Sequence, residues 1–140
     1  MKNLEIYIHI PFCVRKCEYC DFLSFPADDD AKLRYVKGLM AEMIFYGPLM
    51  KNYQVSSVYI GGGTPSSIDE QWIAALMEGV FDCFNVLPDA EISIECNPGT
   101  LSREKLLAYR DAGINRLSIG LQSANNDELK LLGRIHTLSL

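Results

Sequence analysis

The sequence predicts an α/β fold, a partial barrel of parallel strands with outer helices, in which about four βα units are present. Short apolar segments alternate along the chain with helical stretches, a rhythm typical of βα units and a parallel sheet. The strands are also apolar on one face and polar on the other, whereas an open sheet with helices on both faces is apolar on both. A curved sheet with a polar lumen explains both observations. A half-solvated sheet is the alternative, but it is usual for antiparallel hairpins.

The elements follow in a regular order. We expect strands at residues 4–10, 55–60, 90–96 and 114–120, and helices at residues 30–46, 69–84, 102–111 and 125–133. Asp69 and Ser102 are suited to cap helix N-termini, and Gly113 is suited to end a helix. In the third strand the side chains alternate, so Cys96 lies on the apolar face and Glu95 on the polar face. In such barrels functional groups gather where the strands end.

Composition excludes several classes of protein. Apolar residues make up 49% of the 140 residues, which is enough for a packed core, and no apolar run approaches the ~20 residues of a membrane helix. The net charge of −5 and the absence of a basic run argue against nucleic acid as a partner. The N-terminus lacks the features of a secretory signal, so we expect a cytoplasmic protein with reduced thiols.

Three cysteines follow the first strand in the segment "CVRKCEYC", at Cys13, Cys17 and Cys20. Clustered cysteines in a reducing compartment more often bind metal or react than form disulfides. A [4Fe–4S] cluster is normally held by four thiolates, so three would leave one iron open for a small ligand. The alternative is a zinc site with His9 as the fourth ligand. The residues alone leave both alternatives open.

Five motifs together carry a family resemblance. "CVRKCEYC" resembles the cluster motif of the radical S-adenosylmethionine (SAM) superfamily. "YIHIPFC", "GGGTPS", "ECNPG" and "GINRLSIGLQS" resemble the branch that holds the oxygen-independent coproporphyrinogen III oxidase HemN and the heme chaperone HemW. The motifs stand in the family's order, and the resemblance covers residues 7–136.

The resemblance implies the cofactors and their chemistry. A [4Fe–4S] cluster on Cys13, Cys17 and Cys20 would bind SAM at its open iron and cleave it to methionine and a 5′-deoxyadenosyl radical. The implied partners are SAM, heme or a porphyrinogen, and an electron donor protein. A membrane-associated heme acceptor is implied for the full-length family, and heme is a further candidate cofactor.

The resemblance also implies the residues that bind SAM, which are Tyr7, Tyr19, Gly62, Gly63, Thr64, Glu95, Gln122 and Arg134. The glycines allow backbone to approach a ligand, so we expect free backbone groups there to pair with the polar end of SAM. Glu95 would accept hydrogen bonds from ribose hydroxyls or the methionine ammonium. Its alternative role is that of an ordinary lumen charge paired with a neighbour such as Arg116.

One position distinguishes the two members of the branch. HemN-type enzymes carry a further cysteine where this chain has Phe22, in "CDFLSF". The difference favours a HemW-like heme chaperone over a coproporphyrinogen oxidase-like oxidoreductase. A zinc- or heme-binding module without SAM chemistry is the third hypothesis. Whether the chain is itself an enzyme stays open.

The length predicts a fragment. The resemblance implies a (β/α)6 barrel followed by a C-terminal domain, and about four units are found here. We therefore expect residues 1–140 to be the N-terminal part of a radical SAM core domain, truncated and impaired in activity. Residues that bind heme would lie beyond residue 140.

Overall fold

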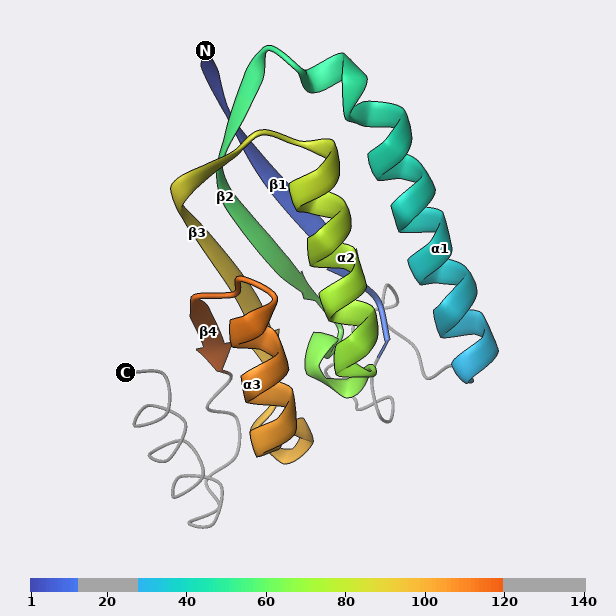
Figure 1. Cartoon of the computed structure of the whole chain (residues 1–140). Helices are drawn as coiled ribbons and strands as arrows, with labels where there is room; N and C mark the ends of the chain where they lie inside the picture. The colour runs from blue at the N-terminus through green and yellow to red at the C-terminus, as the bar shows by residue number, and fades with distance from the viewer. Residues whose placement is uncertain (13–27, 120–140) are drawn as a thin grey trace.

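The computed structural model of the chain describes residues 1–12 and 28–119. Its strands are β1 (Lys2–Ile10), β2 (Tyr53–Gly62), β3 (Val86–Cys96) and β4 (Arg116–Ile119), all parallel and in the order β1-β2-β3-β4. Its helices are α1 (Asp29–Tyr46), α2 (Glu70–Cys83) and α3 (Arg103–Asp111). The helices lie together on one face of the sheet (Figure 1). The predicted α/β class, with parallel strands and outer helices, is confirmed.

Helix boundaries follow the predicted caps closely. Asp69 and Ser102 cap α2 and α3, each accepting a hydrogen bond from a backbone N–H in the first turn. Gly113 has a φ of +99°, the left-handed conformation that glycine adopts readily after a helix. The first helix begins one residue earlier than predicted, because Asp28 caps it by accepting the Ala31 N–H at 2.8 Å. The helix predicted at 125–133 lies outside the described residues.

The first three strands, β1, β2 and β3, begin earlier than the apolar pattern predicts. β3 begins at Val86 although Pro88 and Asp89 are poor strand residues. The register explains this, because Val55 of β2 pairs with Val86 whereas the next recorded pair joins Ser57 to Glu91. The residues between the two pairs leave the ladder, so Pro88 sits where a backbone donor is not needed. Three short 3₁₀ helices, η1 (Pro48–Met50), η2 (Pro65–Ser67) and η3 (Pro98–Thr100), complete the described elements.

The core lies between the sheet and the helices. Ile10, Ile60 and Ile94 come from three neighbouring strands and are fully buried, as are Leu76 and Val80 of α2. Burial of such side chains contributes about 1.5–3 kcal/mol each. The apolar face of the sheet therefore meets the helices, which leaves the polar face on the opposite side. No helix within residues 28–119 has the length and apolarity that crossing a bilayer requires.

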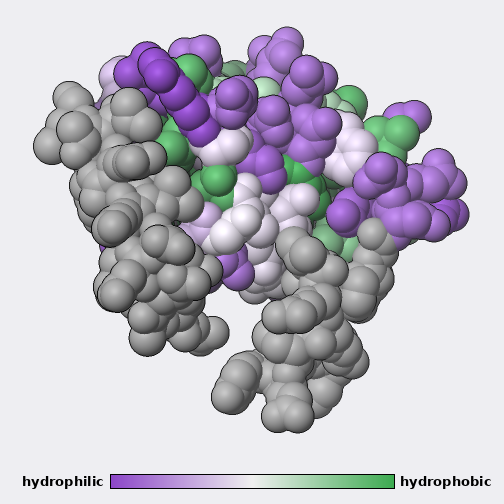
Figure 2. Space-filling view, turned by 90° about the horizontal axis from the view of Figure 1, so that it is seen from below, coloured by the Kyte–Doolittle hydropathy of each residue, from purple (hydrophilic) through white to green (hydrophobic). Residues whose placement is uncertain are grey.

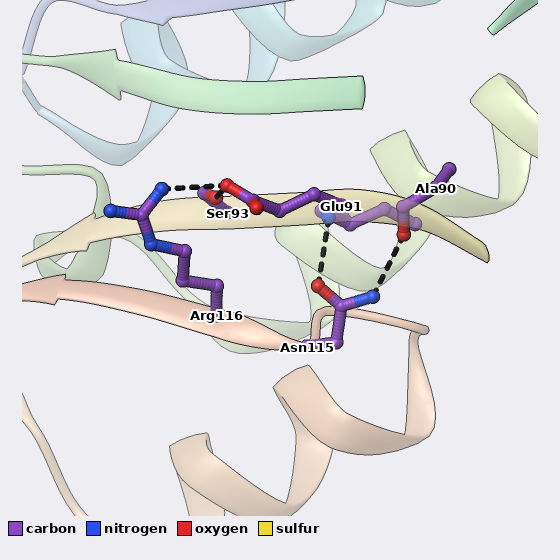
Figure 3. Close-up of polar contacts among 6 residues, drawn as sticks. Ala90, Glu91, Ser93, Asn115 and Arg116 are labelled. Carbon is purple, nitrogen blue, oxygen red and sulfur yellow. Dashed lines mark hydrogen bonds and ion pairs between the residues drawn. The ribbon is translucent and has the colours of Figure 1, made fainter. Parts of the chain in front are cut away.

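Asn115 fastens the start of β4 to β3. Its side chain accepts the Ile92 N–H at 2.8 Å and donates to the Ala90 carbonyl at 2.9 Å (Figure 3). Its own backbone N–H donates to the Ile92 carbonyl. The amide thus replaces a further residue pair of the ladder, and the strand begins at Arg116 rather than at Ile114 as predicted.

Candidate functional site

Polar-face side chains of adjacent strands form two rows across the sheet. The first row comprises Tyr7, Tyr59, Ser93 and Arg116, and the second, closer to the strand ends, comprises His9, Gly61, Glu95 and Ser118. Seen from that end, a pale surface of near-neutral hydropathy lies near the centre, with small hydrophobic patches beside it and hydrophilic residues mostly above and to the right (Figure 2). The strand ends are therefore the candidate site, as the sequence predicts.

Glu95 reaches from β3 across the end of β2. Its Oε1 atom accepts the Gly62 N–H at 2.8 Å. A Cβ atom added to Gly61 would lie 2.2 Å from that same oxygen, a distance that real atoms do not adopt. The Glu95 carboxylate can therefore occupy this position only because Gly61 has no side chain. The contact joins "GGGTP" to "ECNPG" directly.

The pairing of Glu95 with Arg116, which the sequence left as an alternative, does not occur. Arg116 instead lies 2.6 Å from the carboxylate of Glu91, and both side chains are more than half exposed (Figure 3). Side chains on one face of a strand are two positions apart, and Arg116 pairs with Ser93 of β3. Glu91 lies one such step before Ser93, so its ion pair with Arg116 is away from the strand ends. Glu95 keeps a carboxylate at the candidate site without a cation recorded beside it among the described residues.

The turn after β2 uses its backbone N–H groups inside the protein. Besides Gly62, Gly63 donates to the Ile10 carbonyl at 2.8 Å and Thr64 donates to the Phe12 carbonyl at 2.6 Å. The prediction of free backbone groups in this turn is therefore wrong for its donors. What the turn can offer a ligand is acceptors, namely carbonyl oxygens and the Thr64 hydroxyl. Acceptors suit an ammonium group.

Tyr7 and Tyr59 form an aromatic surface beside the carboxylate. Their ring centroids are 6.0 Å apart with an interplanar angle of 13°, and Tyr7 is 58% exposed. The Tyr7 hydroxyl lies 3.1 Å from His9 Nδ1. Partial burial, the charge of Glu95 and the neighbouring Tyr59 raise the pKa of Tyr7, so its phenol stays protonated. Sequence reasoning missed Tyr59, although strand alternation places it on the same face as Gly61.

The entry to the cysteine segment is held by α1. Phe12, the residue before Cys13, is 1% exposed and packs edge-to-face on Tyr35 with ring centroids 5.3 Å apart. The Tyr35 hydroxyl donates to the His9 carbonyl at 2.5 Å. Through the bond from Thr64 to Phe12, the chain enters this segment directly beside the glycine turn.

Replacing Tyr35 with phenylalanine tests this anchor. Tyr35→Phe keeps the ring against Phe12 but leaves the His9 carbonyl without its donor, so we expect a loss of about 1–2 kcal/mol in the free energy of unfolding. Urea denaturation measures it. Tyr46→Phe, at an exposed ring at the end of α1, is the control and should change stability by less than about 0.5 kcal/mol. Equal effects of the two changes would contradict the anchor.

Cys96 is a buried thiol rather than a ligand. It is 6% exposed, and burial, the largest effect, raises its pKa to about 12 despite the opposing charge of Lys105. A metal ligand must be a thiolate. At pH 8 the Cys96 thiol therefore stays protonated.

We therefore expect Cys96 to resist alkylation in the folded chain. Peptide mass spectrometry after iodoacetamide treatment at pH 8 should find Cys96 labelled at least about a hundredfold more slowly than after denaturation. The partly exposed Cys83 serves as the internal reference. Rapid labelling of Cys96 in the folded chain would contradict the burial of its thiol in the structure.

The structure brings five of the predicted site residues together at one edge of the sheet, namely Tyr7, Gly62, Gly63, Thr64 and Glu95. Cys13, Cys17, Cys20, Tyr19, Gln122 and Arg134 lie outside the described residues, and for them the predictions stand as made.

Comparison with known proteins identifies the family. The sequence model of the radical SAM superfamily matches residues 7–139. The chain belongs to the radical SAM superfamily. The chain is 42% identical over 139 residues to the heme chaperone HemW of Escherichia coli, covering 95% of this chain and 35% of that protein. It is 39% identical to the HemW of Haemophilus influenzae, with 95% and 36% covered, and 40% identical to the mitochondrial radical S-adenosyl methionine domain-containing protein 1 of Bos taurus, with 97% and 31% covered.

A solved radical SAM structure has the same fold. The coproporphyrinogen III oxidase HemN of Escherichia coli, described as a radical SAM enzyme, superposes with a TM-score of 0.80 at 34% identity, over 95% of this chain and 31% of that one. The chain spans about a third of the length of these relatives. As a radical SAM protein, it shares with them the part that contains the cysteine triplet and the glycine turn.

Proposed function

We propose that this chain holds a [4Fe–4S] cluster on Cys13, Cys17 and Cys20 and binds SAM at the ends of β1, β2 and β3. The observation that carries the proposal is the contact of Glu95 with Gly62, because it puts a carboxylate and a turn of backbone acceptors beside the point where the cysteine segment begins. When bound, the cluster supplies the electron that cleaves SAM to methionine and a 5′-deoxyadenosyl radical.

The described residues fit the parts of SAM in chemical terms. The carboxylate of Glu95 and the carbonyl oxygens of Gly62 and Gly63 are acceptors for the methionine ammonium or for ribose hydroxyls. The Tyr7 ring offers an exposed aromatic face with a protonated hydroxyl. The space at Gly61, which a Cβ atom would fill, lets the carboxylate lie over the strand end rather than project from it. Tyr19, Gln122 and Arg134 complete the proposed SAM contacts.

Within the superfamily, we propose that the protein is a HemW-like heme chaperone. The 42% identity to HemW exceeds the 34% identity to HemN, and Phe22 stands where HemN-type sequences carry a further cysteine. Heme would then be a cargo, delivered to an acceptor protein at a membrane, and an electron donor protein would reduce the cluster. A thiolate cluster needs a reducing compartment, so we propose the cytoplasm.

The second candidate is a coproporphyrinogen oxidase-like oxidoreductase, which the structural match to HemN favours. Heme binding against coproporphyrinogen turnover, measured on a full-length version, separates the two. Tight heme binding without turnover supports the chaperone, and turnover supports the oxidase.

Anaerobic reconstitution with iron and sulfide tests the cofactor proposal. We expect about four irons per chain, the visible absorbance of thiolate-bound iron, and 5′-deoxyadenosine on reduction with SAM. Cys17→Ser should lose the cluster, whereas Cys83→Ser, a cysteine in α2, should keep it. One tightly bound zinc per chain with no iron absorbance would instead support the zinc alternative with His9. Intact iron binding without SAM binding would overturn the SAM part alone.

A further inference from the structure

A small hydrogen-bonded ring joins the turn after β2 to the turn after β3. Ser66 of η2 is fully buried, and its Oγ atom accepts the Asn97 backbone N–H at 3.0 Å. The same oxygen is within hydrogen-bonding distance of the Thr100 hydroxyl in η3. The Thr100 hydroxyl in turn donates to the Asn97 carbonyl at 2.8 Å. Two of these bonds join the two turns, and the third lies within the turn after β3.

Counting protons gives the direction of every bond in this ring. A hydroxyl has a single proton to donate, and Thr100 gives its proton to the Asn97 carbonyl. Ser66 must therefore donate to Thr100, while it accepts from the Asn97 N–H. The ring runs from the Asn97 N–H through Ser66 and Thr100 back to the Asn97 carbonyl, so each hydroxyl is both donor and acceptor. Bonds arranged in this way strengthen one another.

The ring lies directly behind the candidate site. Asn97 follows Glu95 by two residues, and Ser66 follows Gly62 by four. The Ser66 carbonyl also accepts a hydrogen bond from the Lys105 ammonium of α3, which ties the turn to a helix as well as to a loop. None of these groups belongs to the predicted SAM contacts. The hydrogen bonds of Ser66, Asn97 and Thr100 hold the turn after β3 against the turn after β2.

We infer that Ser66 is a positioning residue, whose hydroxyl holds the two turns in register so that the Glu95 carboxylate meets the Gly62 N–H. The inference rests on the proposed function in one respect only, namely that the ligand bound beside Glu95 is SAM. The geometric part, the contact between Glu95 and Gly62, is a hydrogen bond within the chain and can be tested apart from SAM. It also links "GGGTPS" to "ECNPG", since the last residue of the first bonds the middle residue of the second.

The neighbouring residue provides a matched control. Ser67 is also in η2, and its Oγ atom is buried but has no hydrogen-bond partner among the described residues. Ser66→Ala and Ser67→Ala therefore delete the same atom one residue apart, within the ring and outside it. Thr100→Ser keeps the ring hydroxyl, whereas Thr100→Val removes it at nearly constant shape.

Two measurements on the full chain test the inference. In the unliganded chain, we expect Ser66→Ala and Thr100→Val to speed hydrogen exchange of the Gly62 amide about tenfold, and in the reconstituted chain to raise the Kd for SAM about tenfold. Ser67→Ala and Thr100→Ser should leave both within about twofold of wild type. If Ser66→Ala does not fold, the comparison of Thr100→Val with Thr100→Ser tests the inference instead.

The outcomes separate the inference from the function on which it rests. A lower unfolding temperature with unchanged Gly62 exchange and unchanged Kd would show that the ring is merely structural, and would overturn the inference. A wild-type chain that binds cluster but no SAM would defeat the proposed function, while the exchange of Gly62 would still decide whether Ser66 positions Glu95.

Discussion

Gly62→Ala should lower the free energy of unfolding by about 3 kcal/mol, because two effects act at one position. Gly62 has a φ of +123°, where residues with a side chain are strained. An added Cβ atom would also lie 2.6 Å from the Ile10 carbonyl oxygen and 3.0 Å from the His9 ring. The ring can turn away, but the carbonyl belongs to the ladder of β1 and cannot. Urea denaturation monitored by circular dichroism gives the value.

The same substitution elsewhere in the chain has the opposite expected sign. Gly38 lies in the interior of α1, and a Cβ atom added there meets nothing within 4 Å. Gly38→Ala should therefore stabilise the chain by about 0.5–1 kcal/mol, since glycine is the poorer helix former. A tolerated Gly62→Ala variant would mean that the turn after β2 is not held in the conformation described.

Glu95→Gln should weaken SAM binding about 10- to 100-fold while changing the free energy of unfolding by less than about 1 kcal/mol. Glutamine keeps an oxygen that accepts the Gly62 N–H, so the contact between β2 and β3 survives. What it removes is the negative charge that an ammonium group would meet. Titration of the reconstituted chain with SAM measures the affinity.

Glu91 is the matched control for this charge. It lies on the same strand and the same face, four residues before Glu95, and its carboxylate is paired with Arg116 at 2.6 Å. Glu91→Gln should leave SAM affinity within about twofold and cost at most about 1 kcal/mol, because exposed ion pairs contribute little. If both variants lose affinity equally, net charge matters rather than the position of Glu95.

The sequence predicted most of the fold because its signals are local. Short apolar segments identified the four strands, and single residues such as Asp69 and Ser102 marked where helices begin. The boundaries that differed have causes outside the segment itself. Pro88 is tolerated in β3 only because the pairing with β2 skips past it. β4 starts late because the Asn115 side chain substitutes for a residue pair.

At the candidate site, the sequence predicted the position of Glu95 but not its contacts. Alternation placed Glu95 on the polar face at a strand end, which the structure confirms. Its partner could not be predicted, because Gly62 is 33 residues away and the carboxylate reaches it only through the gap at Gly61. Charge alone favoured Arg116, which the register gives to Glu91 instead. The role of Ser66 could not be predicted, because serine is common in turns and its partners Asn97 and Thr100 lie more than 30 residues away in the sequence.

Strand order in the sheet has a consequence for how the chain is made. Because the spatial order β1-β2-β3-β4 repeats the order along the chain, every strand after the first pairs with the one synthesised just before it. The ribosome releases the N-terminal end first, so each βα unit can dock on a partner that has already emerged. None of the four described strands needs a segment synthesised later in order to pair with the strand before it. Folding can therefore proceed stepwise with synthesis, and each new strand adds to the edge formed by the strand before it.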